Sequence, residues 1–432
     1  MADVMNFKCP CCGAALNFSG KTGEMTCEYC GASFTMEQAK EAQEAEKVDA
    51  ASSDMTWTTT EQLMIKDESG QIKGYKCPSC AAEMVADENT AATECPYCGN
   101  QAIIPQAFDG IYKPEVVIPF SVDKSEAKGK LEEFTKGKKL LPKSFTEGNR
   151  IEDITGLYVP FWLYSCHASG EVSYDGVKSK KWSDANYEYE KKDHYSIMRS
   201  GDMDFSRIPV NAASQMDDAT MDSLEPFDYG KAVPFDAAYF SGYLANRYDV
   251  EEKDAQPKAN GRVTQTFKEK IKDTVKGYTE VSEKSDAIQL SNAKAEYAML
   301  PVWMMTTKYN DEKFTFGING QTGKLVGSLP IDKGLSKKYF IISTLISFVI
   351  LQVLLVLLGL VTAVIEVVAL IIALIIGFIY LSYLKGQMNT IAVQTGAANY
   401  FVDGSFKPGS TEDRFLFTKT EKREKPKKEG DS

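Results

Sequence analysis

Nine of the ten cysteines in this 432-residue chain fall within its first 98 residues, in two sets with the same spacing. Each set has a C-x2-C pair, a fourteen-residue spacer and a second C-x2-C pair, and the sets are offset by 68 residues. Each short turn presents two thiolates, and two such turns complete a tetrahedral four-sulfur site. The sequence therefore predicts two structural Zn2+ ions, bound by Cys9, Cys12, Cys27 and Cys30 and by Cys77, Cys80, Cys95 and Cys98.

With four protein sulfurs for each ion, neither site keeps an open position for water, so the metals are expected to be structural and not catalytic. Iron in a rubredoxin-like site stays open as an alternative, because the same paired turns can hold it. Disulfides are a further alternative, which the cytoplasmic location expected below disfavours. Cys11 does not match the repeat and is expected to be a spare thiol, although it could replace Cys9 or Cys12 as a ligand. The glycine that follows three of the four pairs is replaced by Ala81 in the fourth.

Charge argues against a nucleic-acid partner for the cysteine-rich region. Residues 1–110 contain seven lysines, no arginine and seventeen acidic residues, a net charge of −10. Contacts to phosphates need Lys and Arg, and arginine is the usual reader of guanine edges. The two predicted four-cysteine zinc modules, or zinc ribbons, are therefore expected to bind protein or to be purely structural. Nucleic acid is not expected as a partner.

The segment that fixes the rest of the chain in space is Tyr339–Leu384, forty-six residues whose only formal charge is Glu366. One helix of that length would be about 69 Å long, more than twice the thickness of the bilayer hydrocarbon. The segment is therefore predicted to fold back near Gly359 and Thr362 into two transmembrane helices. A buried hairpin in a soluble core is disfavoured because soluble helices carry a polar stripe. Glu366 is expected at the membrane interface, without a partner in this chain.

Lysines flank both outer ends of this hairpin and are absent from its turn. Lys333, Lys337 and Lys338 precede the hairpin, and Lys385 follows it. The positive-inside rule then predicts a bacterial membrane protein with two spans and both termini in the cytoplasm. The N-terminus lacks the charged and apolar regions of a signal peptide, in agreement with that orientation.

These features divide the chain into seven segments. The expected fold class is multidomain, with two small four-cysteine zinc ribbons, an α+β cytoplasmic domain and a two-helix transmembrane hairpin. The end of the tail, Lys419–Ser432, mixes both signs of charge and is expected to be disordered. In chain order, the segments are ribbon 1 (1–35), a helix and linker (36–70), ribbon 2 (71–110), the α+β domain (111–330), a juxtamembrane piece (331–338), the hairpin (339–384) and a cytoplasmic tail (385–432).

Within the α+β domain, turn and capping residues predict the elements. A strand at Glu115–Ile118 precedes a helix that Ser121 caps and that ends near Lys136. Gly156–Tyr164 (GLYVPFWLY) is a compact apolar strand, and Leu300–Tyr309 (LPVWMMTTKY) repeats its Pro-x-Trp core, which suggests that two related half-domains pair. Further hairpins and helices are predicted from periodicity. The hairpins are Gly170–Val210 and Phe314–Val326, and the helices are Ala212–Leu224, Asp236–Tyr248 and Val263–Lys276.

Several segments resemble bacterial TFIIB-type zinc-ribbon membrane proteins, sometimes described as primosomal-helicase-like. The resemblance spans about residues 9–384 and is carried by the paired ribbons, by GLYVPFWLY and by two long motifs, Ser223–Val250 and Leu300–Pro330. Some members of that family are encoded beside flotillin-like (SPFH) and TPM-domain proteins. The resemblance implies a membrane-associated assembly, one that docks an envelope-stress effector of the phage-shock type.

Residues that could support catalysis are few. The chain has two histidines, His167 and His194, and no GxxxxGK[ST] phosphate loop, which removes the ATPase core that a helicase needs. Cys166 adjoins His167, but neighbours on a strand point to opposite faces, so they are not expected to form a pair. Three clustered carboxylates are expected to form a solvated helix face: Asp217, Asp218 and Asp222.

The sequence therefore favours a membrane-anchored zinc-ribbon adaptor or scaffold, and not an enzyme. Its expected partners are the lipid bilayer and membrane-associated proteins, with flotillin-like, TPM-domain or phage-shock-type proteins suggested by the resemblance. The alternative is a membrane-tethered nucleic-acid-binding or replication-associated ribbon protein. A cofactor-free enzyme comes third.

Overall fold

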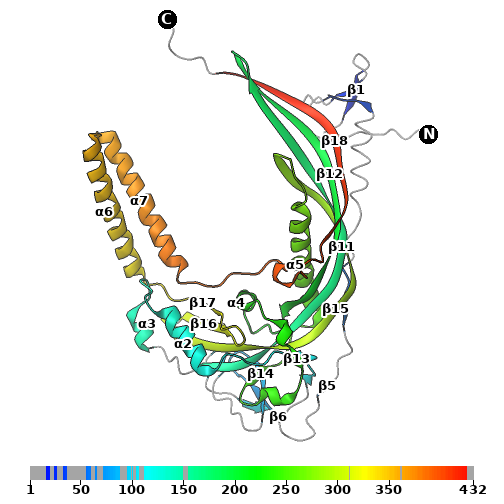
Figure 1. Ribbon diagram of the computed structural model, residues 1–432. Helices are drawn as coiled ribbons and strands as arrows, with labels where there is room; N and C mark the ends of the chain where they lie inside the picture. Colours follow the sequence, from blue (N-terminus) through cyan, green and yellow to red (C-terminus); the bar gives the residue numbers. More distant parts are fainter. Residues whose placement is uncertain are drawn as a thin grey trace, which may run out of the picture.

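The structure of the protein is a computed structural model. It describes residues 16–19, 24–26, 33–36, 55–59, 64–65, 72–87, 95–98, 100, 104–106, 111–148, 154–310, 312–360 and 362–425. A curved, mostly antiparallel β-sheet forms the frame of the molecule (Figure 1). Two long helices stand apart from the sheet, on the side of its concave face (Figure 1).

Four long strands form the spine of this sheet. β11 (Thr155–Ser183) and β12 (Tyr187–Asn211) make one antiparallel hairpin. β15 (Glu280–Tyr309) pairs with the other edge of β11, and β18 (Lys407–Glu424) pairs with the outer edge of β12. The hairpin predicted at Gly170–Val210 is therefore confirmed, as part of one long hairpin.

Shorter strands extend the base of the sheet on both sides of β11 and β15. β14 (Leu244–Asn246) lies parallel to β11 and antiparallel to β7 (Glu83–Asp87). β7 pairs with β6 (Ile72–Lys76), and β6 pairs on its other edge with β8 (Ile104–Gln106). The strands that extend the sheet beyond β15 are β10 (Val116–Val117), β13 (Val233–Pro234), β4 (Thr58–Thr59), β16 (Glu312–Asn319) and β17 (Leu325–Gly327).

The antiparallel pair β16–β17 confirms the hairpin predicted at Phe314–Val326, and β10 confirms the strand predicted at Glu115–Ile118. Among the described residues, two small sheets lie apart from the main one. One is a pair formed by β5 (Met64–Ile65) and β9 (Ile111–Tyr112). The other is three-stranded and is described with the cysteines below.

The two Pro-x-Trp segments lie side by side at the centre of the sheet. β11 and β15 run antiparallel there, with Tyr158 opposite Pro301 and Val159 opposite Leu300. Tyr158 and Trp162 contribute to one buried cluster, whereas Val159 and Leu300 contribute to another. The strands are therefore buried on both faces, which is why they have continuous apolar sequences. The two segments that share the motif are neighbours in one sheet, and the expectation of two related half-domains stays a prediction.

In the described part of the chain, four helices cover this sheet: α2 (Lys124–Thr135), α3 (Lys143–Gly148), α4 (Asp218–Leu224) and α5 (Glu252–Lys272). α2 confirms the predicted helix, although Asp123 and not Ser121 caps it, by accepting a hydrogen bond from the N–H of Glu126 at 2.8 Å. α5 lies on the concave face of the sheet (Figure 1). It buries an apolar stripe against β11 and β12 that includes Phe267 and Ile271.

Three helix predictions need correction. The predicted helix Asp236–Tyr248 is wrong: a 3-10 turn at Ala237–Phe240 and Gly242, which has a φ of +81°, lead into β14. The helix predicted from Ala212 begins only at Asp218. The helix predicted at Val263–Lys276 is the second half of α5, which begins eleven residues earlier at Glu252. Pro257 and Gly261 have low helix propensity and hid that first half.

The apolar segment forms two helices, α6 (Lys333–Leu358) and α7 (Ala363–Gly386), each long and apolar enough to span a membrane. α6 ends at Gly359, whose φ of +66° suits a glycine cap. α7 begins after Thr362, whose hydroxyl accepts a hydrogen bond from the N–H of Ile365 at 3.4 Å. The predicted helical hairpin and the position of its turn are therefore confirmed.

Small residues let these two helices approach closely. Ala369, Ala373 and Gly377 are the buried positions in the middle of α7, spaced four residues apart. A Cβ added to Gly377 would collide with Thr344 Oγ1 of α6. Near the turn, the Gln352 amide donates a hydrogen bond to Glu366 at 2.8 Å. The prediction that Glu366 has no partner is therefore wrong.

The chain after the hairpin returns to the sheet and forms its last long strand. Residues 387–406 lead into β18, which pairs with β12 from Asp202–Lys407 to Tyr187–Glu424. The first six residues of the predicted disordered segment belong to this strand, so that prediction is wrong for 419–424. Alternating charges are common on exposed edge strands, and composition alone does not reveal a distant pairing partner. Residues 426–432 lie outside the described residues.

Two Gly→Ala substitutions in α7 test the close helix packing. Gly377→Ala should lower the melting temperature of the full-length protein in detergent, because the added methyl group collides with Thr344 and overpacking costs about 1–3 kcal/mol. Gly386→Ala is the matched control, since no atom beyond its chain neighbours and its own helix backbone lies within 4 Å of its Cβ position. It should leave stability unchanged or raise it slightly, because alanine favours helices. Equal effects of both variants on thermal unfolding would contradict the packing argument.

Candidate metal centre

The second cysteine set occupies two turns at the base of the sheet. Cys77 follows β6 directly, and Cys80 lies in the turn that connects β6 with β7. The N–H of Ala81 donates to the C=O of Cys77, and the N–H of Cys77 donates to the C=O of Ala82, both at 2.9 Å. Ala81 has a φ of +60°, which costs a residue with a side chain roughly 1–2 kcal/mol. The turn therefore keeps the glycine-like backbone conformation without the glycine.

The two turns bring four sulfur atoms together, all within 4.8 Å of one another. The Sγ atoms are 3.6 Å apart in the pair Cys77–Cys98 and in the pair Cys80–Cys95. Four thiolates bound to one ion at about 2.3 Å would lie about 3.8 Å apart. A disulfide needs a separation of about 2.05 Å, and all four thiols are free in the structure. The cluster fits a four-sulfur metal site.

Backbone amides favour a thiolate at one of these positions. Burial alone would raise the pKa of Cys77, but hydrogen bonds from the amides of Cys80 and Ser79 outweigh it and lower the pKa to about 7. Burial raises the pKa of Cys80 and of Cys95. These two thiols are therefore protonated at neutral pH unless a cation replaces the protons. Metal binding should release protons and weaken as the pH falls.

The cluster packs against the central sheet and does not stand alone. One cysteine of each turn, Cys77 and Cys95, is fully buried, and the other two are half-buried. Both buried cysteines share a core cluster with apolar residues of β11 and β15. The hydroxyl of Thr306 on β15 donates a hydrogen bond to the C=O of Pro96 at 2.9 Å. An ion bound here would therefore hold β6, β7 and the second turn against β15.

The first set, Cys9, Cys12, Cys27 and Cys30, lies outside the described residues together with Cys11, and its metal site stays a prediction. The described residues of this region form an antiparallel sheet of β1 (Asn17–Ser19), β2 (Glu24–Thr26) and β3 (Ser33–Phe34). Phe34 packs edge to face on Phe417 of β18, with ring centroids 5.0 Å apart. The small sheet therefore contacts the long arm of the main sheet, which consists of β18 and the paired ends of β11 and β12 near Ser183 and Tyr187. It lies far from the second cysteine set (Figure 1).

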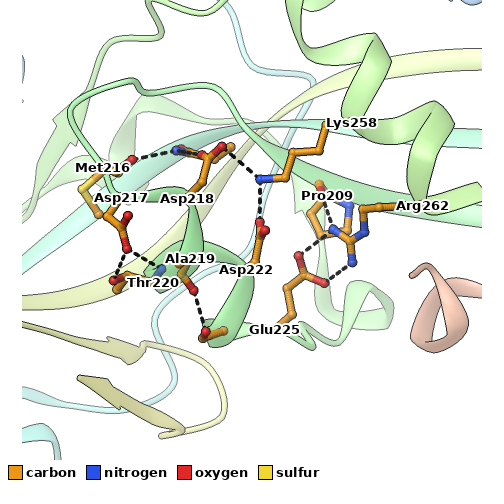
Figure 2. A network of polar contacts seen from close by, with 12 residues as sticks. Pro209, Met216, Asp217, Asp218, Ala219, Thr220, Asp222, Glu225, Lys258 and Arg262 are labelled. Carbon is orange, nitrogen blue, oxygen red and sulfur yellow. Dashed lines mark hydrogen bonds and ion pairs between the residues drawn. The ribbon is translucent and has the colours of Figure 1, made fainter. Parts of the chain in front are cut away.

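A second polar cluster lies between α4 and α5, where the sequence predicted only a solvated face (Figure 2). Asp217 caps α4 and accepts hydrogen bonds from the N–H and the hydroxyl of Thr220 at 2.9 and 2.8 Å. Asp222 is only 2% exposed and lies 2.9 Å from the ammonium group of Lys258, which also reaches Asp218 at 3.1 Å. The prediction was therefore wrong for Asp222, because α5 lies against this side of α4.

Beside this cluster lies a fully buried ion pair (Figure 2). The guanidinium of Arg262 donates two hydrogen bonds to the carboxylate of Glu225, at 2.8 and 2.6 Å. It also donates to the C=O of Pro209 at 2.7 Å and of Gly396 at 3.1 Å. Burial raises the pKa of Glu225, and the attraction of Arg262 opposes that rise. The pair joins α5, the end of α4, β12 and the segment that follows the apolar hairpin.

The tenth cysteine, Cys166, lies in the core of the sheet. Burial raises its pKa to about 12, so the thiol is protonated at neutral pH. His167 Nδ1 lies 2.7 Å from a carboxylate oxygen of Asp204. The Cys166 thiol is therefore not activated as a nucleophile. The expectation that the protein is not an enzyme stays a prediction.

The fold and the cysteine cluster define a class: a mixed α/β protein with a four-cysteine cluster compatible with metal binding and two helices that could span a membrane. The chain is 31% identical over 337 residues to the uncharacterized protein YdjG of Bacillus subtilis (strain 168). That alignment covers 78% of this chain and 93% of YdjG, so the chain belongs to the same family as YdjG. No family model and no solved structure matches the chain.

Substitution of one cysteine tests the metal centre. Cys80→Ser should lower the metal content of the purified, reduced protein by one ion per chain, because a hydroxyl is a poor ligand for a site of this kind. Elemental analysis measures the content. Cys166→Ser is the control, since that thiol is buried elsewhere in the core. Unchanged metal content in Cys80→Ser would contradict a four-sulfur site.

The buried ion pair predicts a large difference between single and double substitutions. Arg262→Met leaves the Glu225 carboxylate buried and unpaired, which should lower the free energy of unfolding by about 3–5 kcal/mol. Arg262→Met combined with Glu225→Leu should recover much of that loss, because no buried charge remains. Arg247→Met is the control, since its ion pair with Glu83 is solvent-exposed and worth at most about 1 kcal/mol. Denaturant titration measures all three. A double variant no more stable than Arg262→Met would contradict this account.

Proposed function

We propose that the protein is an adaptor that a two-helix hairpin anchors in the bacterial membrane and that presents its folded domain to partner proteins in the cytoplasm. One observation carries the proposal. The hairpin lies between β17 and β18 in the chain, and both flanking strands belong to the same main sheet. The anchor is therefore an insertion within the folded domain, and not an appendage at its end.

Contacts at the base of the hairpin support a firm connection. The N–H of Asp332 donates to the C=O of Leu140 at 2.9 Å, just before α6 begins. After α7, the ammonium group of Lys138 donates to the C=O of Gln387 at 2.7 Å. The N–H of Leu329 donates to the C=O of Met388 at 2.8 Å. Both ends of the hairpin are thus bonded to the domain, so that the anchor limits how the sheet can tilt.

The segment between α7 and β18 adds a second line of contacts. The N–H of Ala392 donates to the hydroxyl of Ser223 at 2.8 Å, and the N–H of Ala397 donates to Thr266 at 2.7 Å. The Arg262–Glu225 pair holds the C=O of Gly396 between these points. The segment therefore crosses α4 and α5 before the chain enters β18. An adaptor that must hold a partner at a fixed place near a membrane needs such a link.

Two structural Zn2+ ions in two TFIIB-type ribbons are part of this proposal, since the first set repeats the spacing of the clustered set. Both termini are proposed to lie in the cytoplasm, because lysines flank the outer ends of the hairpin. The partners proposed are flotillin-like, TPM-domain or phage-shock-type proteins, from the resemblance of the sequence. A replication-associated ribbon protein is the alternative, and the acidic ribbon region disfavours it.

Crosslinking in intact cells tests the partner and the orientation together. A membrane-permeant, amine-reactive crosslinker should join lysines of the sheet to membrane-associated proteins, identified by mass spectrometry. An impermeant reagent of the same length should give no such products, because the bilayer would shield the sheet. Cys80→Ser should weaken capture and Cys166→Ser should not. Capture of replication proteins would favour the alternative, and equal products with both reagents would overturn the orientation.

A further inference from the structure

The loop between α2 and α3 lies against the foot of the apolar hairpin, the end where α6 begins and α7 ends (Figure 1). The ammonium group of Lys139 in this loop donates a hydrogen bond to the hydroxyl of Tyr380 of α7 at 3.0 Å. It also lies 5.9 Å from the centroid of the Tyr339 ring of α6 and 5.7 Å from that of the Tyr380 ring. One side chain of the loop therefore reaches both apolar helices.

The contact with Tyr380 lies within the apolar helix and not beyond its end. Tyr380 precedes Lys385, the last charged residue of α7, by five residues, which corresponds to about 7.5 Å along a helix. Tyrosine is enriched at both boundaries between a membrane and water. If the two helices span a bilayer, the loop between α2 and α3 therefore lies at the level of the lipid headgroups, whichever leaflet the foot faces.

Apolar side chains fix the loop in this place. Leu140 and Leu141 of the loop are buried. They share a core cluster with Leu384 of α7 and with Met388, and Tyr339 packs against the same cluster. The loop is therefore part of the foot, and it follows the hairpin wherever the hairpin is anchored.

Lysines gather at this junction of loop and foot. Three segments form it: 132–148, which contains the loop, and 332–339 and 380–388, which form the foot. Together they contain eight lysines and four acidic residues, in a chain whose net charge is −11. The turn 308–313 between β15 and β16, beside α3, adds two lysines and two acidic residues and so no net charge. The eight lysines are Lys136, Lys138, Lys139, Lys143, Lys333, Lys337, Lys338 and Lys385.

The protein does not neutralise these charges. Seven of the eight lysines are exposed, and Lys138 is half-buried. Within the described residues, none of the eight takes part in an ion pair. Asp332, the acidic residue of the foot, instead caps α6 by accepting a hydrogen bond from the N–H of Leu335 at 2.8 Å. The junction therefore has an excess of positive charge that is free to meet an anion.

We propose that the junction of loop and foot binds the phosphate groups of anionic phospholipids. The inference rests on the proposed anchoring of α6 and α7 in a bilayer. Basic sites beside transmembrane helices bind anionic headgroups, and each lysine near such a surface adds to the attraction. A soluble phosphate or an acidic protein segment offers similar charge. Lipid is favoured because the hairpin holds the junction among headgroups, at a much higher effective concentration.

Native mass spectrometry of the full-length protein in a neutral detergent counts the lipids that it binds. Phosphatidylglycerol should bind more tightly than phosphatidylcholine. Lys136→Gln with Lys139→Gln should weaken the binding of phosphatidylglycerol by about fivefold for each lysine. Both side chains are exposed, so the fold should be retained. Lys124→Gln with Lys128→Gln is the matched control: it removes two charges towards the other end of α2, where Lys124 lies about 18 Å from Lys136, and should leave binding unchanged.

Equal binding of the two lipids, or equal loss in both double variants, would overturn the proposal. So would displacement of phosphatidylglycerol by an equal concentration of glycerol 3-phosphate or of an acidic peptide, because the occupant would then be a soluble phosphate or a protein segment. Carbonate extraction of membranes tests the anchor separately. Release of the protein would overturn the anchor and this inference with it. Retention of the protein without a preference for phosphatidylglycerol would overturn this inference alone.

Discussion

The antiparallel pairing of β11 with β15 is the contact on which the rest of the structure depends. It brings together residues as distant in sequence as Tyr158 and Pro301, at the loop-closure cost of any long-range pairing. Burial of both faces offsets that cost, at roughly 25 cal/mol for each Å² of apolar surface. The cysteine cluster attaches to β11 through β14 and β7, and β18 attaches through β12. Loss of this pairing would separate the cysteine cluster from the apolar hairpin.

The cysteine cluster and the hairpin could be predicted because their signals are local. Cys77 and Cys80 are three residues apart, and each turn is specified by its own short sequence. The apolar hairpin is read from a continuous segment, and Gly359 marks its turn through backbone conformation alone. The Pro-x-Trp segments could be predicted as strands because fully buried strands are apolar throughout, but their pairing with each other comes from the structure.

The rest could not be predicted because it depends on partners that are distant in the chain. β18 has the composition of a solvated tail, and only its pairing with β12 makes it a strand. Asp222 resembles any acidic residue on a short helix until α5 places Lys258 against it. Gln352 gives no sign in the sequence that it will meet Glu366. In each case a polar side chain or an unpaired strand edge is satisfied by a neighbour that local sequence does not reveal.

The location of the hairpin between β17 and β18 bears on how the protein is made. Translation produces β12 long before Lys407–Glu424, and at about 5–20 residues per second the intervening chain takes roughly 10–40 s to emerge. Throughout that interval the outer edge of β12 lacks its final strand, and an open edge of this kind invites aggregation. Both apolar helices leave the ribosome before the strand that closes the sheet. Synthesis of the apolar hairpin and completion of the sheet are thus ordered steps of one biosynthetic sequence, and a delay in the first prolongs the most vulnerable stage of the second.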